Sequence, residues 1–406
     1  MAEENNEQVI EDDPIEVRRA KREALLAEGK NPYGHAAFEY SHHIADLDEK
    51  YAELADGENT EDAVSIAGRV MAKRVQGKII FFELQDATGR IQLFCRINAL
   101  GEDAFAEMKD LDLGDWIGAH GLMMRTRRGQ LSVAVDSFQL LSKALRPLPE
   151  KFHGLNDKEI RYRQRYVDLI VNDEVRDTFQ KRSKILSAFR RYMEADGYYE
   201  VETPILQTVQ GGATAKPFIT HFNALNQENY LRIATELHLK RLLVGGFERV
   251  FEIGRIFRNE GMDPTHNPEF TSMEAYCAFN DLQGMKKLAQ GVIKAANAAV
   301  NDSEQLEYQG QTIDISGEWP SIPMTEIVSK ALGEEVTLDT PVSHLSELAK
   351  KNGIEVKPEW TAGKLIAELY DEIGEPTIVN PAFVVDYPVE VSPLAKRFED
   401  DPRLTD

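Results

Sequence analysis

The sequence predicts an α+β protein of several domains, with a small β-barrel in its first half and an antiparallel sheet in its second half. Three observations support this fold class. Short β-rich runs crowd residues 64–142. The proline-braced run "RPLPE" at 146–150 is typical of a domain linker. Two further strand-like runs, 249–258 and 269–279, flank a polar loop and predict a long β-hairpin.

Length, composition and charge narrow the possible functions. A chain of 406 residues is long for one domain, and 42% apolar with 29% charged residues is typical of a globular protein. No apolar run approaches the roughly 20 residues that span a bilayer, and the acidic start lacks the layout of a secretory signal. We therefore expect a cytoplasmic protein without a membrane partner. Cys95 and Cys277 lack the spacing of a zinc site or a disulfide framework. The net charge of −22 argues against a coat of nucleic acid, and we expect no DNA partner.

The first half is expected to contain a tail, a helical segment and the barrel. Residues 1–14 are charged and poor in apolar groups, which predicts a disordered acidic tail. Residues 15–60 form a helical segment whose first helix stops at Gly29. Five strand-like runs within 61–145, separated by turns and one short helix, suit a small barrel, with the OB-fold as the leading candidate.

Three basic runs interrupt this acidic chain, at 18–22, 69–78 and 125–128. Each is either ordinary solvated surface or a local footprint for nucleic acid, because phosphate contacts depend on local charge density. Phe81 and Phe82 follow the second run, and one of two adjacent strand residues must face the core. The other is a candidate for stacking on an unpaired base.

The second half is predicted to begin with a linker at 146–178, followed by a domain at 179–406. A helical run ends at Gly197, and the strand after it stops at Pro204. From about 282 to 375 the pattern is mostly helical, and the runs "QGQTIDIS" and "GEPTIVN" are predicted strands.

The loop of the predicted hairpin, "NEGMDPTHNP", holds more charge than a surface turn needs. Side chains alternate faces along a strand, so Phe270, Glu274 and Tyr276 share one face, and Arg258 stands at the loop entrance. Burying so many polar groups without a ligand would be costly. The pattern predicts a pocket wall rather than a core layer.

The residue types of this wall suit an anion bound beside a flat ring and a cation. Arg258 is a candidate clamp for a carboxylate or a phosphate. His266 is placed to follow a polyphosphate, and Phe270 to stack on a purine. Glu236 and Glu274 are candidates for holding a cationic amino group. Any one of these residues alone would more often be an ordinary surface group, so the joint pattern is the informative observation.

The same residues resemble a known family. The stretch "GRIFRNEGMDPTHNPEFTSMEAY" closely resembles motif 2 of class II aminoacyl-tRNA synthetases, in the form typical of lysyl-tRNA synthetases. Within it, "FRNEG" and "THNPEFT" separate lysyl enzymes from the aspartyl and asparaginyl ones. The resemblance covers nearly all of residues 15–396 through "RRAKREALLAEGKNPY", "GRVMAKRVQGKIIFFELQDATGRIQLF", "RYRQRYVDLI", "FRRYMEADGYYEVETPIL", "GGATAKPFITHFNAL", "GGFERVFEIGR" and "DYPVEVSPLAK".

The resemblance implies a fold, a reaction and a set of site residues. The barrel would be an OB-fold anticodon-binding domain and the second domain a class II antiparallel-sheet catalytic domain. ATP, with Mg²⁺, would activate L-lysine to lysyl-adenylate, and the lysyl group would pass to the 3′ end of tRNA(Lys). Arg258 would bridge the lysine carboxylate and the α-phosphate as the catalytic residue. The other implied roles are ATP binding by Arg258, Glu260, His266, Asn267 and Phe270; lysine binding by Gly212, Glu236, Arg258, Glu274 and Tyr276; and anticodon binding by Phe81, Gln92 and Arg74. Motif 1, which ends at Pro204, would lie at a homodimer interface.

Two departures from the family pattern qualify these expectations. Thr235 and His238 stand where a proline and a tyrosine are commoner. The chain also stops at Asp406, before the family's magnesium-binding glutamates, a further lysine-pocket carboxylate and motif 3. We therefore expect a C-terminally truncated catalytic domain without metal ligands, inactive or nearly so in lysine-dependent pyrophosphate exchange. The alternatives are a non-catalytic tRNA-binding fragment and a paralogue that lysylates a protein, although such paralogues usually lack the barrel.

Overall fold

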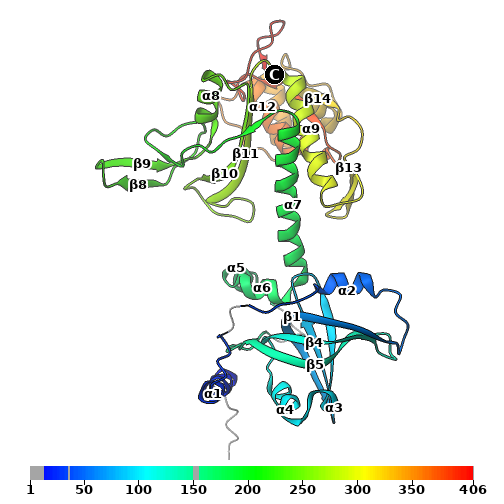
Figure 1. Cartoon of the computed structure of the whole chain (residues 1–406). Coiled ribbons are helices and arrows are strands. Elements are labelled where there is room, and N and C mark those ends of the chain that lie inside the picture. The colour runs from blue at the N-terminus through cyan, green and yellow to red at the C-terminus, as the bar shows by residue number, and fades with distance from the viewer. Residues whose placement is uncertain (1–12, 35–36, 150–154, 406) are drawn as a thin grey trace, which may run out of the picture. The chain divides into compact units, whose positions relative to one another are not determined.

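A computed structural model describes residues 13–34, 37–149 and 155–405 of the chain, which divides into two compact units, Met1–Val175 and Arg176–Asp406 (Figure 1). The predicted acidic tail falls almost entirely on residues 1–12, which lie outside the described residues, as does the last residue of the run "RPLPE". No helix in the described ranges has both the length and the apolar character needed to cross a bilayer.

The first unit contains the predicted five-stranded barrel. Its closed strand order is β1-β2-β3-β5-β4, antiparallel throughout except for the parallel pair β3 and β5. The strands are β1 Asn59–Gln76, β2 Ile79–Gln85, β3 Arg90–Arg96, β4 Trp116–Arg125 and β5 Leu131–Ser142. This arrangement is that of an OB-fold and confirms the prediction.

Alternation along the strands fills the barrel core. In β2, Ile80, Phe82 and Leu84 are buried, while the residues between them face outward. The helices α2 Ile44–Lys50, α3 Ile97–Leu100 and α4 Glu102–Asp110 lie beside the barrel. Phe105 and Met108 of α4 join the same core, so the short helix predicted near 101–110 is confirmed and helps to close the barrel.

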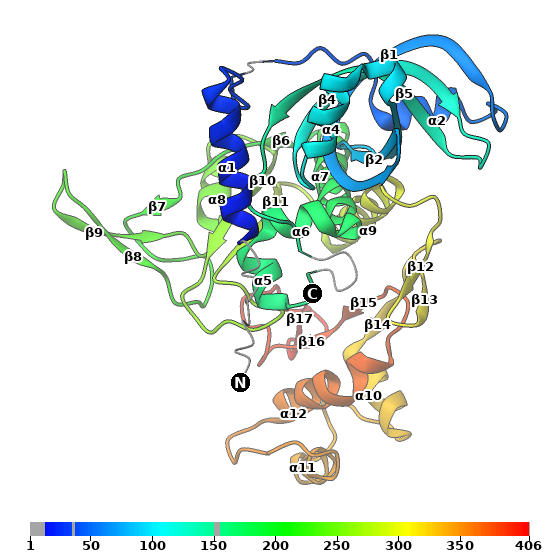
Figure 2. The same ribbon diagram turned by 90° about the horizontal axis from the view of Figure 1, so that it is seen from below.

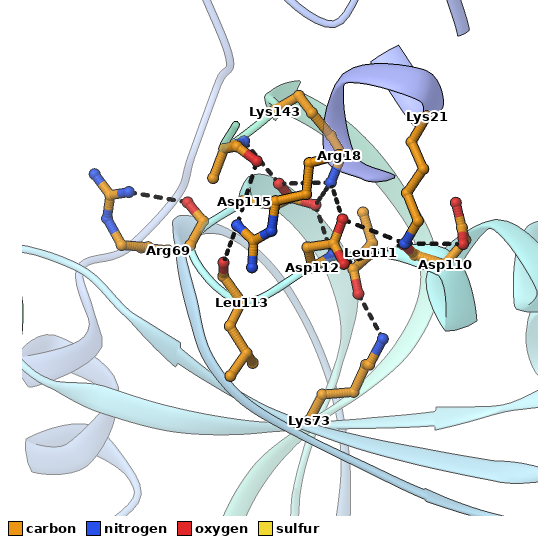
Figure 3. Close-up of polar contacts among 12 residues, drawn as sticks. Arg18, Lys21, Arg69, Lys73, Asp110, Leu111, Asp112, Leu113, Asp115 and Lys143 are labelled. Carbon is orange, nitrogen blue, oxygen red and sulfur yellow. Dashed lines mark hydrogen bonds and ion pairs between the residues drawn. The ribbon is translucent and has the colours of Figure 1, made fainter. Parts of the chain in front are cut away.

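Helix α1, Pro14–Ala27, is anchored to the barrel by polar contacts rather than by an apolar face (Figure 3). The buried guanidinium of Arg18 donates from Nη1 to the carbonyl oxygens of Leu113, Ala144 and Arg146 at 3.0, 3.3 and 3.1 Å. Gly29, at φ 75°, follows the helix in the left-handed region that favours glycine, as the predicted helix stop requires.

Beneath α1, two lysines and two aspartates form a partly buried ion-pair cluster, in which Lys143 and Asp115 are buried. Lys143 contacts Asp112 and Asp115, and Lys21 contacts Asp112 from the helix. Asp115 is fully buried and also accepts from the amides of Asp112 and Ala144, both at 2.8 Å. Burial opposes ionisation of Asp112, but hydrogen bonds and charge from Lys143 and Lys21 outweigh it and lower the pKa of that carboxyl.

The region predicted as a linker contains helices: α5 Lys158–Arg163, α6 Arg165–Val171 and the start of α7 Asp173–Ala195. The fully buried Asp168 organises α5 and α6, because it accepts from Arg161 at 2.8 Å and pairs with Arg165. The boundary between the two compact units falls inside α7, after Val175.

The second unit is built around a sheet of order β11-β10-β6. These strands are β6 Tyr199–Glu200, β10 Arg249–Phe257 and β11 Glu269–Cys277. Met193 of α7 packs with Phe251 of β10 and with Leu288 and Val292 of α9, Leu282–Ala298. A second small sheet, of order β7-β9-β8, contains β7 Leu206–Gln207, β8 Ile219–Phe222 and β9 Gln227–Leu231, and α8, Glu236–Val244, follows it.

The remaining residues of this unit form a separate helical core. Figure 2 shows α10, α11 and α12 grouped together, and their apolar faces share one buried cluster. The elements here are β12 Gln305–Tyr308, β13 Gln311–Asp314, β14 Ser321–Pro323, α10 Met324–Leu332, α11 Val342–Lys351, α12 Ala362–Leu369, β15 Phe383–Val385, β16 Tyr387–Pro388 and β17 Leu404–Thr405.

Two strand predictions need correction. The run "GEPTIVN" is not a strand: a π-helical turn at Tyr370–Gly374 continues into a 3-10 turn at Glu375–Thr377. Pro376 lies at the start of that turn, where its fixed φ suits a helix and its missing N–H is not needed. The strand predicted up to Pro204 is shorter than expected, because β6 already ends at Glu200, and the next strand, β7, begins at Leu206, beyond the proline that cannot donate to a ladder.

Candidate active site and nucleic-acid interface

The hairpin of β10 and β11 has the register that places the predicted residues on one wall. Glu252 lies opposite Glu274, and Ile256 lies opposite Phe270. Directly opposed residues of an antiparallel pair share a face, so Phe270, Glu274 and Tyr276 line one side of β11, as alternation predicts.

A buried ion pair lies on the same face of the hairpin as this wall. Arg232, which follows β9, pairs with Glu252 of β10, and the two side chains are 3% and 4% exposed. Thr203 donates to the second oxygen of Glu252 at 2.6 Å. Gly254 leaves the space for the arginine, because a Cβ there would lie 2.1 Å from Arg232 Nη2. The pair ties β10 to the chain that precedes α8.

Arg258 and Phe270 meet at the loop end of the wall. The guanidinium lies 5.3 Å from the centre of the Phe270 ring, and the amide of Arg258 donates to Pro268 O at 2.8 Å. Arg258 Nε is buried and has no hydrogen-bond partner among the residues that the structure describes. A buried guanidinium nitrogen without an acceptor is unfavourable in free energy. This end of the wall therefore suits an anionic ligand that lies beside the Phe270 ring.

The loop itself is exposed and held by short-range bonds. Asp263 accepts from the amides of Thr265 and His266 at 2.7 and 2.8 Å, and its carboxylate pairs with the His266 ring. Bonds from Thr265 first, and from His266, lower the pKa of Asp263. Glu260 accepts from the amide of Lys216 at 3.2 Å. Glu260, His266 and Asn267 are therefore on one exposed loop. This loop is at the opposite end of the hairpin from Glu274 and Tyr276.

The carboxylate end combines Glu274 and Tyr276 with the start of α8. Glu274 accepts from the amide of Thr235 at 3.0 Å and from the Tyr276 hydroxyl at 3.3 Å. Glu236 pairs with Lys240 at 2.6 Å, one helical turn further along. Burial, and then the charges of Glu274 and Glu236, raise the pKa of Tyr276, so its phenol stays protonated and donates.

Gly212 lies close to the start of α8, at the end of the wall that holds Glu274 and Tyr276. Its φ of +88° is in the left-handed region, and a Cβ there would lie 3.1 Å from Ala234 Cβ and 3.3 Å from Glu236 Cβ. The glycine therefore lets the loop "GGATAKPF" approach the backbone before α8. The structure thus brings Gly212, Glu236, Glu274 and Tyr276 together, and Arg258 with Phe270 at the other end of the wall.

The two departures from the family pattern both belong to this region. Thr235 is the N-cap residue of α8 and is 2% exposed. His238 lies one turn into the helix, where burial and then the nearby Arg241 lower its pKa. The imidazole is therefore neutral near pH 7 and adds no cation beside Glu236.

The outward face of the barrel carries a row of aromatic and cationic side chains. Phe82 is 1% exposed and belongs to the core, so Phe81 is the member of the pair that faces outward. Arg74 of β1 and Phe94 of β3 lie opposite Phe81 on either side. The Arg74 guanidinium is 4.9 Å from the centre of the Phe81 ring, and the two phenyl rings are 5.4 Å apart.

Gln92 lies on the same outward face, one step along β3. It is opposite Glu83 and donates from Nε2 to Ser132 Oγ at 2.9 Å. The sequence prediction missed Phe94 and Arg96, whose guanidinium lies 5.4 Å from the Phe94 ring centre. The missed signal was period two along β3, since Gln92, Phe94 and Arg96 must share a face.

The basic runs divide into internal and exposed cations. Figure 3 shows Arg69 and Lys73 of the second run turned to main-chain carbonyls: Arg69 bonds Gly114 O at 2.9 Å, and Lys73 bonds Leu111 O at 2.5 Å. Arg18 and Arg125 also satisfy carbonyls. Neither reading, solvated surface or footprint for nucleic acid, therefore describes a whole run, because each run mixes cations that bond the chain with exposed ones. The exposed cations of the three runs are Arg19, Arg74, Lys78, Arg127 and Arg128.

Family models match both halves of the chain. Residues 157–406 match the family model described as tRNA synthetases class II (D, K and N), and residues 64–141 match that of the OB-fold nucleic acid binding domain. The chain is 47% identical to a lysine–tRNA ligase of Pediococcus pentosaceus over 97% of this chain and 79% of the relative. It is 48% identical to that of Thermosynechococcus vestitus (96% and 78%), and 46% identical to that of Enterococcus faecalis (100% and 82%). The chain belongs to the class II tRNA synthetases and, within them, to the lysine–tRNA ligase family.

Proposed function

We propose that the hairpin wall binds L-lysine and ATP for the formation of lysyl-adenylate, and that the barrel binds the anticodon of the tRNA(Lys) that receives the lysyl group. One observation carries the proposal. A buried, unpartnered arginine nitrogen beside an aromatic plate, and a carboxylate–phenol pair beside α8, occupy the two ends of the same wall. A lysyl nucleotide matches both ends: its phosphate and its base suit the arginine and the aromatic ring, and its side-chain ammonium suits the carboxylate and the phenol.

Lysine activation needs positioning more than it needs a reactive side chain. The lysine carboxylate attacks the α-phosphorus, a bond to the α-phosphate forms, and pyrophosphate leaves. Arg258 would contact the carboxylate and the α-phosphate and neutralise charge that develops between them. Phe270 would stack on the adenine, with Glu260, His266 and Asn267 of the loop near the rest of the nucleotide. No covalent bond to the protein is required.

Selection of lysine would rest on Glu236, Glu274 and Tyr276. An ammonium donates three hydrogen bonds and accepts none, which matches carboxylate acceptors. Glu236 accepts from the Lys240 ammonium at 2.6 Å, one turn further along α8, so its carboxylate already pairs with an amine of the chain. An uncharged amino acid would leave a carboxylate without its counter-charge, which costs several kcal/mol, so the pocket would discriminate against it.

Mg²⁺ accompanies ATP in the family, but the residues that the structure describes form no site for it. Among the described residues, no group of three or more histidine, cysteine, aspartate or glutamate side chains could hold a metal ion. We therefore derive no step of the reaction through a metal held by this chain.

The barrel would bind tRNA through its outward row. An anticodon base would stack on Phe81, with Phe94 beside it, and Arg74 would contact phosphate. Gln92 has both a donor and an acceptor for reading a base edge, and its contact with Ser132 orients it. The presence of this barrel disfavours a role as a protein-lysylating paralogue.

We also propose a homodimer through the segment around β6. Tyr199, Val244 and Phe247 are 63%, 91% and 43% exposed, and Tyr199 packs edge-on against Phe247. Tyr199 and Phe247 line a hollow of about 580 Å³ together with Gly245 and Gly246. Exposed apolar groups of this size commonly mark an interface. Sedimentation of the purified chain would show a dimer, and a monomer at micromolar concentration would contradict this proposal.

A second candidate function is tRNA binding without charging. Among the described residues the sheet that carries the hairpin has three strands, and β11 pairs on one side alone, with β10. An unpaired strand beside a ligand wall is a weak platform for precise positioning. This observation favours slow or absent lysine activation by the 406-residue chain on its own.

One paired experiment separates the two functions. Filter binding of tRNA(Lys) across a range of salt concentrations is run beside lysine-dependent pyrophosphate exchange and tRNA charging. Salt-sensitive binding with charging supports the ligase, and salt-sensitive binding without exchange supports the binding module. Absence of tRNA binding would contradict both.

A further inference from the structure

The side-chain hydroxyl of Thr235 is buried and makes no hydrogen bond to the described residues. An N-cap threonine usually accepts a hydrogen bond from an amide in the first turn of its helix. Thr235 makes no such capping bond to α8. Its Oγ1 is also buried without a hydrogen-bond partner in the part of the chain that the structure describes. A buried hydroxyl without a partner is unfavourable, so its retention needs an explanation outside the fold.

The backbone of the same residue is already engaged with the pocket. The Thr235 amide donates to Glu274 Oε1 at 3.0 Å, while the other oxygen of that carboxylate accepts from Tyr276 at 3.3 Å. Both oxygens of Glu274 are therefore oriented by donors. The proline that is commoner at this position has no N–H and would leave one of them free.

The surroundings of the Thr235 backbone point to a role for its hydroxyl. Its amide touches Glu274, and the next residue along the chain is Glu236. An ammonium has three donors and no acceptor, so a hydroxyl oxygen beside carboxylates adds an acceptor of the required kind. An anion would instead be repelled by both carboxylates, which excludes the phosphate end of the substrate as its partner.

We propose that Thr235 is a positioning and specificity-determining residue of the lysine pocket. Its N–H fixes the Glu274 carboxylate, and its hydroxyl accepts a hydrogen bond from an ammonium group of lysine. The inference rests on the proposed function. It adds Thr235 to the residues of the lysine pocket, at a position where the family more often has proline.

The test compares three variants of the full chain with the unmodified chain, by titration calorimetry with L-lysine and separately with ATP. Thr235→Val keeps the shape and the N–H but removes the hydroxyl, so the lysine Kd should rise about tenfold, as for one lost bond to a charged group. Thr235→Ser keeps both groups and should stay within about twofold. Thr235→Pro removes both groups and should bind lysine more weakly than Thr235→Val. The ATP Kd should change in none of them.

Thermal unfolding separates this role from a structural one. Removing a buried, unpartnered hydroxyl should leave the Tm of Thr235→Val equal to or above that of the unmodified chain, while lysine affinity falls. A merely structural residue would lower the Tm and both affinities together. Equal lysine affinities for Thr235→Val and the unmodified chain would overturn the hydroxyl's role, and Thr235→Pro binding as tightly as Thr235→Ser would overturn that of the N–H. Failure of the unmodified chain to bind L-lysine would overturn the proposed function itself.

Discussion

The outward face of the barrel and the wall of the hairpin use the same residue types in opposite ways. On the barrel, Arg74, Phe81 and Phe94 contact one another across three strands of a closed sheet. On the hairpin wall, polar atoms of Arg258 and Thr235 are buried without partners among the described residues. The barrel also has buried polar atoms without partners among the described residues, Gln85 Oε1 and Arg90 Nε, but these lie at the ends of β2 and β3, four residues along from Phe81 and Phe94. On the hairpin wall, the two polar atoms of Arg258 and Thr235 could still form hydrogen bonds with a small polar ligand.

This comparison predicts that the hairpin wall depends on its supporting ion pair more than on any exposed one. Glu252→Ala would leave the buried Arg232 unpaired, and the free energy of unfolding should fall by about 3–5 kcal/mol. Urea unfolding, followed by circular dichroism and tryptophan fluorescence, measures it.

A matched control is available on the same strands. Arg255 and Glu269 form an exposed pair at 3.5 Å, with about half of each side chain accessible. Glu269→Ala should cost less than about 1 kcal/mol, because solvent screens such pairs. Equal losses for the two variants would show that burial of the Arg232 pair does not set its contribution.

The second prediction concerns the unpartnered arginine. Arg258→Ala removes the group that would face phosphate, and the ATP Kd should rise on the order of 100-fold, as when one partner of a desolvated charge pair is lost. Arg255→Ala is the control, since Arg255 lies opposite Thr271 and therefore on the other face of the hairpin. Titration calorimetry with ATP measures both, and similar effects at the two positions would place the nucleotide elsewhere.

The features that sequence predicted well are those set by local alternation. Period two placed Phe270, Glu274 and Tyr276 on one face without knowledge of the fold, and five β-rich runs predicted the barrel. The resemblance to the family supplied the roles of the residues, which neither alternation nor spacing could give.

The features that sequence could not predict depend on contacts distant along the chain. Arg18 bonds a carbonyl 95 positions away, so nothing in the run "RRAKR" distinguishes this anchoring cation from its exposed neighbours. Thr235 reads as an ordinary N-cap, and its amide meets Glu274 only because the hairpin returns beside α8. The run "GEPTIVN" has strand-like residues, yet Pro376 starts a helical turn there.

The third prediction tests the barrel face by removing one ring at a time. Phe81→Ala and Phe94→Ala should each weaken tRNA(Lys) binding about tenfold, because stacking contributes roughly 1–3 kcal/mol per base. The slope of affinity against salt should not change, since neither ring carries charge. Filter binding measures both quantities, and an unchanged affinity for Phe81→Ala would refute the stacking role.

The smallest effect separates neighbouring cations that the sequence cannot tell apart. Arg74 is exposed and lies over Phe81, whereas burial lowers the pKa of Lys73, whose ammonium bonds Lys109 O at 3.0 Å. Arg74→Gln should weaken tRNA binding a few-fold and reduce the salt slope by about one, as expected for one lost phosphate contact. Lys73→Met should leave affinity and slope unchanged but lower the Tm, because two carbonyls lose their donor. If Lys73→Met instead reduced the slope, the cations turned toward the chain would also reach nucleic acid, and the division between anchoring and exposed cations would fail.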